Sequence, residues 1–119
     1  MVNLDTHIVI LALTGSLRSR ERDLLETEQW CVSAIVLWEL AKLNQLGRIR
    51  MDLSGVEFET AIDMIHVLPI TLEIAIQSCE LDFSSDPADE LIAATSIVHN
   101  VRLLTRDRTI RRSRLVPLA

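Results

Sequence analysis

Short apolar segments alternate with longer amphipathic ones along the whole chain. The apolar segments have the length of β-strands, and they lie at Met1–Leu4, Trp30–Val32, Val67–Ile70 and Val101–Thr105, with a weaker one at Leu115–Val116. Strands that alternate with helices across short connections pair in parallel, and uninterrupted apolar strands belong to a sheet covered on both faces. The sequence therefore predicts an α/β protein with a three-layer α/β/α arrangement around a central, mostly parallel sheet.

The intervening segments carry helix start and stop signals. Thr6, Ser33, Thr71 and Asp86 are suitable N-caps, and Gly15 and Gly47 are suitable stops. Helices are therefore expected over residues 8–13, 17–28, 33–47, 56–66, 71–81 and 86–100, with a short one over 109–113. The polar helix 17–28 is expected to be exposed. Pro69 favours an edge or strand-end position in the third strand.

The length and composition are those of one domain over residues 1–119, because 119 residues with 49% hydrophobic content support a single core. The apolar stretch Ile8–Leu13 is too short to span a bilayer and follows Asp5 rather than a basic region. We therefore expect neither a signal peptide nor a membrane anchor. Cys31 and Cys79 lack metal-binding spacing, which favours free thiols and a cytoplasmic protein.

Two acids directly follow predicted strands. Asp5 ends the first strand, and Asp107 lies in the turn after Thr105. Parallel strands place their carboxyl ends at one edge of the sheet, where proteins of this class build their sites. Both acids are therefore expected at that edge. For Asp107 alone, capping of the short following helix is an alternative explanation.

Two further acids lie on predicted helices. Glu39 shares a face with aliphatic residues at positions 35, 36, 43 and 46, where a carboxylate is costly unless it is paired or bound to a cation. The alternatives are an ion pair with Lys42 or a position at the exposed edge of a broad apolar stripe. Asp89 lies in the first turn of the helix that begins at Asp86 and Pro87, so capping and the helix dipole are alternative reasons for both aspartates.

The convergence of Asp5, Glu39, Asp89 and Asp107 at one edge predicts a bound divalent cation. Carboxylates ~4–6 Å apart repel by several kcal/mol at an effective dielectric constant of about 20, and a cation removes that cost. Oxygen ligands without His or Cys at ligand spacing favour Mg²⁺ or Mn²⁺ over zinc. Such an ion can activate water and hold a phosphate for hydrolysis. The sequence contains neither of the glycine-rich nucleotide-binding motifs.

The charge distribution adds a basic segment to an acidic chain. The net charge is −5, yet residues 102–114 contain six arginines and one acid, a local charge of +5. Arginine binds phosphate through two parallel hydrogen bonds, so this segment is either a solvated helix or a phosphate-binding patch. Because the segment surrounds Asp107, we expect Arg106, Arg108 and Arg111 to contact the phosphates of a substrate.

The motifs around the four acids resemble those of the PIN domain and, within it, the VapC-type toxins of toxin–antitoxin pairs. The resemblance rests, in chain order, on Val2–His7, Ser33–Leu40, Asp86–Ala94 and Leu104–Asp107. It implies an endoribonuclease that depends on Mg²⁺ or Mn²⁺, that cuts RNA such as tRNA or rRNA, that usually forms a homodimer, and that a cognate antitoxin protein neutralises.

By position, the four acids resemble the family's catalytic, metal-binding quartet. Thr6 and Thr105 resemble the hydroxyl residues that flank it, which makes them candidate substrate contacts. Many relatives also have His shortly before the Asp-Pro-x-Asp motif and Arg directly after it. Here Phe83–Ser85 precede the motif and Glu90 follows it, which bears on substrate preference more than on metal binding.

Two rival functions belong to other classes. A non-catalytic PIN-like module that binds a protein would be expected to have a broken quartet, which this chain does not show. A receiver-like signalling domain would have an acidic pair after the first strand and a lysine after the last strand. This chain has one acid after its first strand, Asp5, and its only lysine is Lys42, far from the last strand.

Overall fold

A four-stranded parallel sheet forms the centre of the computed structural model, which describes residues 1–119. The strands are β1 (Val2–Leu4), β2 (Trp30–Ser33), β3 (His66–Leu68) and β4 (Arg102–Leu104). Their order is β3-β2-β1-β4, and all three pairings are parallel. The expected sheet is thus confirmed, including the edge position of the third strand.

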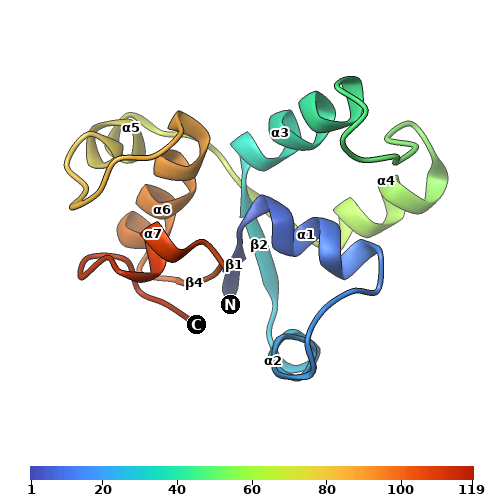
Figure 1. Ribbon diagram of the computed structural model, residues 1–119, viewed down its shortest axis with the longest axis horizontal. Coiled ribbons are helices and arrows are strands. Elements are labelled where there is room, and N and C mark those ends of the chain that lie inside the picture. The colour runs from blue at the N-terminus through green and yellow to red at the C-terminus, as the bar shows by residue number, and fades with distance from the viewer.

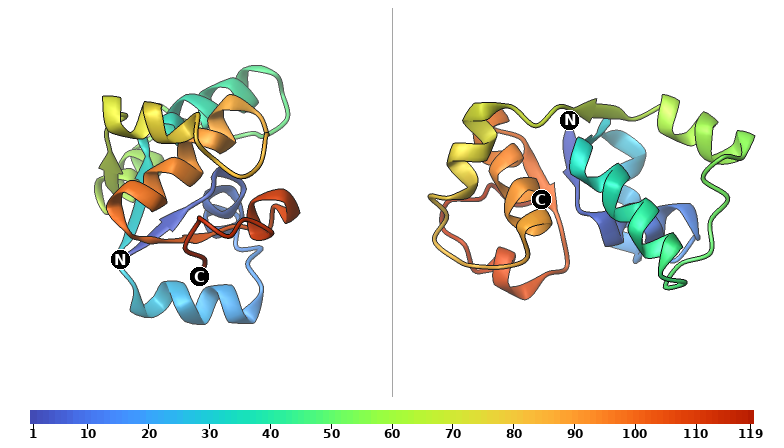
Figure 2. Two further views of the ribbon diagram at one scale, coloured as in Figure 1. Left: turned by 90° about the vertical axis from the view of Figure 1, so that its left-hand side faces the viewer. Right: turned by 90° about the horizontal axis from the view of Figure 1, so that it is seen from above.

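Helices cover both faces of the sheet, as the three-layer prediction requires. Figure 1 shows α5 (Leu72–Ser78), α6 (Pro87–His99) and α7 (Arg108–Arg111) on one side, and α1 (Thr6–Leu13), α3 (Ala34–Gln45) and α4 (Val56–Asp63) on the other. Figure 2 shows the strands between these two groups, with α2 (Ser19–Thr27) beneath the sheet.

The layers meet in a cluster of fifteen buried hydrophobic residues drawn from the strands and from the inner faces of the helices. Val2, Leu4 and Leu103 contribute from the strands, while Leu40 and Ile92 contribute from α3 and α6. All five side chains are fully buried. This packing fixes α3 and α6 against the sheet, and these are the two helices that carry Glu39 and Asp89.

The first helix begins differently from the prediction. The residue that caps α1 is Asp5, which has an extended backbone and a carboxylate that accepts the Thr6 N–H. Thr6 is therefore the first helical residue rather than the cap. Its hydroxyl is consequently free to bond elsewhere.

The caps of α3 and α6 follow the sequence more closely. Ser33 accepts the Ile35 N–H at the start of α3. Pro87 occupies the first turn of α6, and Asn100 ends that helix in the left-handed conformation, with φ of 51°. Asp86 holds the cap position of α6 with no side-chain capping hydrogen bond. Its carboxylate is therefore not needed to begin the helix.

Two expected elements differ in extent. Helix α4 ends at Asp63, and His66 begins the edge strand instead of completing the helix. The weak strand expected at Leu115–Val116 does not form. The Ser113 hydroxyl accepts the N–H groups of both residues, so these donors are unavailable to a strand, and the chain pairs with β4 later, through a bridge between Leu103 and Leu118.

No helix of the structure combines the length and the apolar character needed to cross a membrane.

Candidate active site

Asp5 lies at the carboxyl end of β1, beside the residue that follows β4. The parallel register aligns Leu4 with Leu104, so Asp5 and Thr105 are neighbours just beyond the two strands. The Thr105 hydroxyl donates to Asp5 Oδ2 at 2.6 Å, and the Thr6 N–H donates to Oδ1 at 2.8 Å. The Asp5 side chain is buried, and these two hydrogen bonds hold it in one orientation.

Glu39 enters the same edge from α3. The Thr6 hydroxyl, which follows Asp5 directly, donates to Glu39 Oε1. Lys42 does not pair with Glu39, because its ammonium group donates to Gln45 Oε1 at 3.2 Å. The ion pair that was one of the two alternative explanations for Glu39 is therefore absent, and the Glu39 side chain is half-buried rather than exposed. Burial, together with repulsion from Asp89 and Asp5, raises the pKa of Glu39 above its ordinary value.

Asp89 faces this group from the first turn of α6. The Ser85 hydroxyl donates to Asp89 Oδ2 at 2.8 Å, just before the helix begins. Burial is the main cause that raises the pKa of Asp89, and repulsion from Asp5 and Asp107 adds to it. No ion pair involves Asp89 or Glu39. Both carboxylates are therefore half-buried among other acids, and neither has a cationic partner.

Asp107 completes the edge from the loop between β4 and α7. Its Oδ1 accepts the Ile110 N–H at 3.1 Å, so Asp107 does cap α7. Its own N–H donates to the Thr105 hydroxyl at 3.0 Å. Thr105 thus connects Asp5 and Asp107 through one hydroxyl. Asp107 also contributes to the repulsion that raises the pKa of Asp89.

The donor set suits a hard divalent cation, although the side chains are not arranged around one. Four carboxylates supply only oxygen ligands, as Mg²⁺ and Mn²⁺ prefer, and their mutual repulsion is a cost that a cation would remove. No three His, Cys, Asp or Glu side chains are grouped closely enough to hold a metal ion in this structure. The chemistry of the donors therefore fits an ion, and binding one would require the carboxylates to move closer together.

Two residues near the site escaped the sequence analysis. His7 Nε2 accepts the Arg106 N–H at 3.0 Å, and Nδ1 lies 3.6 Å from Asp5 Oδ2. Glu21, on the helix expected to be exposed, is buried and binds the Arg106 guanidinium through both oxygens, at 2.6 and 2.8 Å. The sequence contains one partial signal for Glu21, because a glutamate in the first turn of a helix commonly accepts the N–H of the capping residue. In the structure, Glu21 accepts the Arg18 N–H in this way.

This ion pair changes the interpretation of one predicted substrate contact. The Glu21 carboxylate holds the Arg106 guanidinium, and the hydrogen bond from Arg106 lowers the pKa of Glu21 to about 2. Arg108 and Arg111 form no ion pair with any acid. Of the three arginines expected to contact phosphate, Arg106 is therefore neutralised by Glu21, and the other two have no acidic partner.

The raised pKa values of Glu39 and Asp89 predict how the stability of the metal-free protein depends on pH. The ordinary values are 4.5 and 3.8, so the native state binds protons more tightly than the unfolded state. The resulting stabilisation is present below these values and is lost as the pH rises through the raised native values. Glu21 acts oppositely, because its stabilisation is present above pH 4.5 and is lost as the pH falls towards 2.

A variant carrying both Glu39→Gln and Asp89→Asn isolates the first effect, because Glu21 is unchanged in it. In EDTA we expect the variant to unfold at a higher denaturant concentration than the wild type at pH 8. The difference should shrink as the pH falls towards 4. Chemical denaturation of both proteins across this range measures it, and parallel pH profiles would contradict the electrostatic account of these two carboxylates.

Comparison with known proteins gives consistent matches. The family model described as "PIN domain" matches residues 2–114. "Ribonuclease VapC22" of Mycobacterium tuberculosis is 34% identical over 90 residues, which cover 73% of this chain and 69% of that protein.

Two solved structures share the fold. A structure of VapBC2 from Rickettsia felis, bound to a DNA fragment from their promoter, superposes with a TM-score of 0.75 at 19% identity, covering 100% of this chain and 98% of that chain. A toxin–antitoxin complex from Klebsiella pneumoniae gives a TM-score of 0.73 at 22% identity, covering 94% of this chain and 91% of that chain.

Proposed function

The chain belongs to the PIN domain family, and from this membership we propose that it is an endoribonuclease of the VapC type that depends on Mg²⁺ or Mn²⁺. Residues 1–119 would form one catalytic domain that hydrolyses phosphodiester bonds of RNA. The similarity to a ribonuclease over most of both chains supports the reaction class.

The observation that carries this proposal is the group of carboxylates without a cationic partner. Burial and repulsion from neighbouring acids destabilise the charged forms of Glu39 and Asp89. Neither carboxylate forms an ion pair with a lysine or arginine. Removing a charge from water, even in part, is unfavourable unless an opposite charge or a cation compensates it. A divalent cation would remove the cost, and it would supply Lewis acidity for hydrolysis at a phosphate.

We assign a role to each residue of the site. Asp5, Glu39 and Asp107 would hold the principal ion, and Asp89 would complete the acidic quartet. The hydroxyls of Thr6 and Thr105, the candidate substrate contacts, donate to Glu39 and Asp5. We therefore propose that the two threonines orient ligands, as the partners of metal-binding side chains commonly do.

Substrate contacts are assigned to the arginines that remain available. Arg108 and Arg111 follow Asp107 on α7, and both are exposed. The Arg111 guanidinium also donates to the Thr105 carbonyl at 3.2 Å, which keeps it near the acidic edge. These two arginines would bind phosphates next to the scissile bond and offset the negative field of the quartet.

Protein partners are also part of the proposal. One structural neighbour is a toxin–antitoxin complex, which supports a cognate antitoxin for this chain. Large apolar side chains such as Trp38, Met64 and Leu72 are exposed by 54%, 79% and 77%, as is common at protein–protein interfaces. We propose that they serve the antitoxin and a second copy of the chain in a cytoplasmic homodimer. A non-catalytic protein-binding module would use the same surfaces.

A cleavage assay separates the enzyme from that alternative. Purified protein is incubated with a mixed RNA population after removal of metal by EDTA, and then again with Mn²⁺ or Mg²⁺ restored. We expect cleavage only after the metal is added. Absence of cleavage with either metal, for a protein that melts cooperatively and is free of antitoxin, would favour the non-catalytic module.

A further inference from the structure

A second charged region lies across Thr105 from the acidic edge. A cavity of about 480 Å³ opens between the start of α2 and the segment that joins β4 to α7. None of the four acids of the candidate active site lines it. Thr105 belongs to both regions, because its hydroxyl contacts Asp5 and the residue is part of the cavity lining. The cavity and the acidic edge thus meet at Thr105.

Five arginines line this cavity, and they come from two segments far apart in the sequence. They are Arg18 and Arg20 at the start of α2, and Arg106, Arg108 and Arg111 near α7. The only acid in the lining is Glu21. Both of its oxygens are already bonded to Arg106, and it accepts the Arg18 N–H as well.

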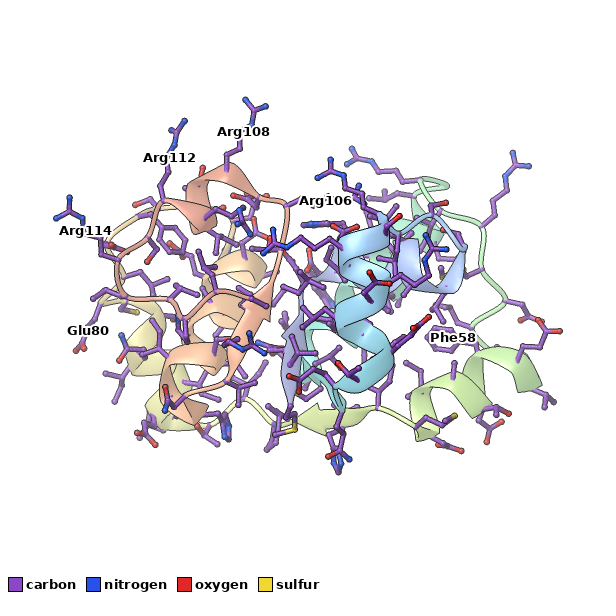
Figure 3. All side chains as sticks on the ribbon, turned by 90° about the horizontal axis from the view of Figure 1, so that it is seen from below. Phe58, Glu80, Arg106, Arg108, Arg112 and Arg114 are labelled. Atoms are coloured by element: carbon purple, nitrogen blue, oxygen red, sulfur yellow. The ribbon has the colours of Figure 1, made fainter.

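The other four guanidinium groups have no acidic partner anywhere in the protein. Figure 3 shows Arg106 beside α2, and it shows Arg108, Arg112 and Arg114 projecting outward from the α7 segment, of which only Arg108 lines the cavity. The neutralised pair of Glu21 and Arg106 therefore forms part of the cavity wall, and the unpaired arginines around it create a concentrated positive potential. Their mutual repulsion favours occupation by an anion.

The lining also indicates the chemical class of that anion. Its apolar members are Leu24, Leu104 and Ala119, so there is no aromatic ring on which a base could stack. Proteins that bind single strands through their bases commonly provide such rings. Guanidinium groups without aromatic neighbours favour phosphate groups instead, which they bind through paired hydrogen bonds.

We propose that this cavity is a phosphate-binding site for the RNA backbone, and that Arg18 and Arg20 extend the substrate path from α7 onto α2. The inference rests on the proposed ribonuclease function. It adds Arg18 and Arg20 as anchoring residues beyond the phosphates assigned to Arg108 and Arg111, and this anchoring does not require metal. The Glu21–Arg106 pair acts as a positioning element that keeps α2 next to the loop carrying Thr105.

The test measures binding in EDTA, so that it does not depend on catalysis. The probe is a single-stranded 2′-O-methyl RNA of about ten nucleotides, which resists cleavage, and fluorescence anisotropy gives its affinity over a range of salt concentrations. The pocket variant carries Arg18→Ala and Arg20→Ala. The matched control carries Arg112→Ala and Arg114→Ala, which removes the same charge from exposed positions outside the cavity.

We expect the pocket variant to bind at least about tenfold more weakly than the wild type at low salt. The slope of the logarithm of its binding constant against the logarithm of salt concentration should become smaller by about 1.4, which is ~0.7 for each lost phosphate contact. The control should retain a slope close to that of the wild type. Equal losses in both variants would show a general field effect and overturn the proposal, as would an unchanged slope in the pocket variant.

The cleavage assay keeps this inference separate from the proposed function. If the wild type cuts RNA with Mn²⁺ but the pocket variant binds the probe as tightly as the control does, the phosphate-binding proposal is wrong and the ribonuclease proposal is retained. If the wild type does not cut RNA although the pocket variant loses binding, the phosphate site stands and the catalytic proposal fails. Melting curves confirm that both variants are folded, as expected for exposed positions.

Discussion

Replacing Glu39 with glutamine is expected to reduce metal-dependent RNA cleavage by at least about 100-fold while the protein remains folded. A residue that acts only by orienting a metal ligand typically contributes ~10–100-fold, so a direct ligand should contribute at least as much. Glutamine retains the size of the side chain and can still accept the Thr6 hydroxyl. The measurement is the initial rate of RNA cleavage with Mn²⁺, compared between variant and wild type.

Lys42→Ala provides the control on the same helix. Lys42 is exposed and contacts Gln45 rather than Glu39, so its loss should change neither the rate nor the melting temperature appreciably. If Glu39→Gln retained wild-type activity, Glu39 would not be a metal ligand. Destabilisation by Lys42→Ala would indicate that the lysine supports Glu39 in solution.

The sheet and its principal helices could be predicted because their signals are local. Ser33 and Pro87 mark helix starts by their own chemistry, and each apolar strand is a continuous run. The parallel arrangement then directs Asp5 and Asp107 to one edge, since strands that run in the same direction end together. Glu39 was detectable because a carboxylate interrupts an aliphatic face of its helix.

What could not be predicted depends on contacts between distant segments. Glu21 lies in a polar helix, and nothing nearby in the sequence indicates that it is buried against Arg106, 85 positions away. The same applies to the Thr105 hydroxyl, which donates to Asp5 across 100 positions. The Thr105–Asp5 bond follows from the register of β1 and β4, and the Glu21–Arg106 pair follows from the position of α2 beside the loop after β4. No sequence pattern encodes either arrangement directly.

The second large effect concerns stability in the presence of metal. A ligand that binds only the native state stabilises it by ~2.7 kcal/mol at a hundredfold excess over its dissociation constant. We therefore expect Mn²⁺ or Mg²⁺ to raise the free energy of unfolding of the metal-free wild type by this amount. Asp89→Asn should be more stable than the wild type without metal, because it removes a carboxylate whose pKa is raised by burial and repulsion.

Asp89→Asn should also gain less stability when metal is added. Asparagine can still accept the Ser85 hydroxyl, so the start of α6 is preserved and the comparison isolates the lost charge. Denaturation with and without Mn²⁺ gives both quantities from the same pair of proteins. An equal gain in variant and wild type would place the metal site elsewhere.

Calorimetric titration of Mn²⁺ into the metal-free protein tests most directly whether the acidic edge is a divalent cation site. We predict saturable binding to the wild type and to Lys42→Ala, with affinity reduced at least about tenfold in both Glu39→Gln and Asp89→Asn. Absence of saturable binding, or equal affinity in all four proteins, would contradict the assignment of Asp5, Glu39, Asp89 and Asp107 as a metal-binding quartet.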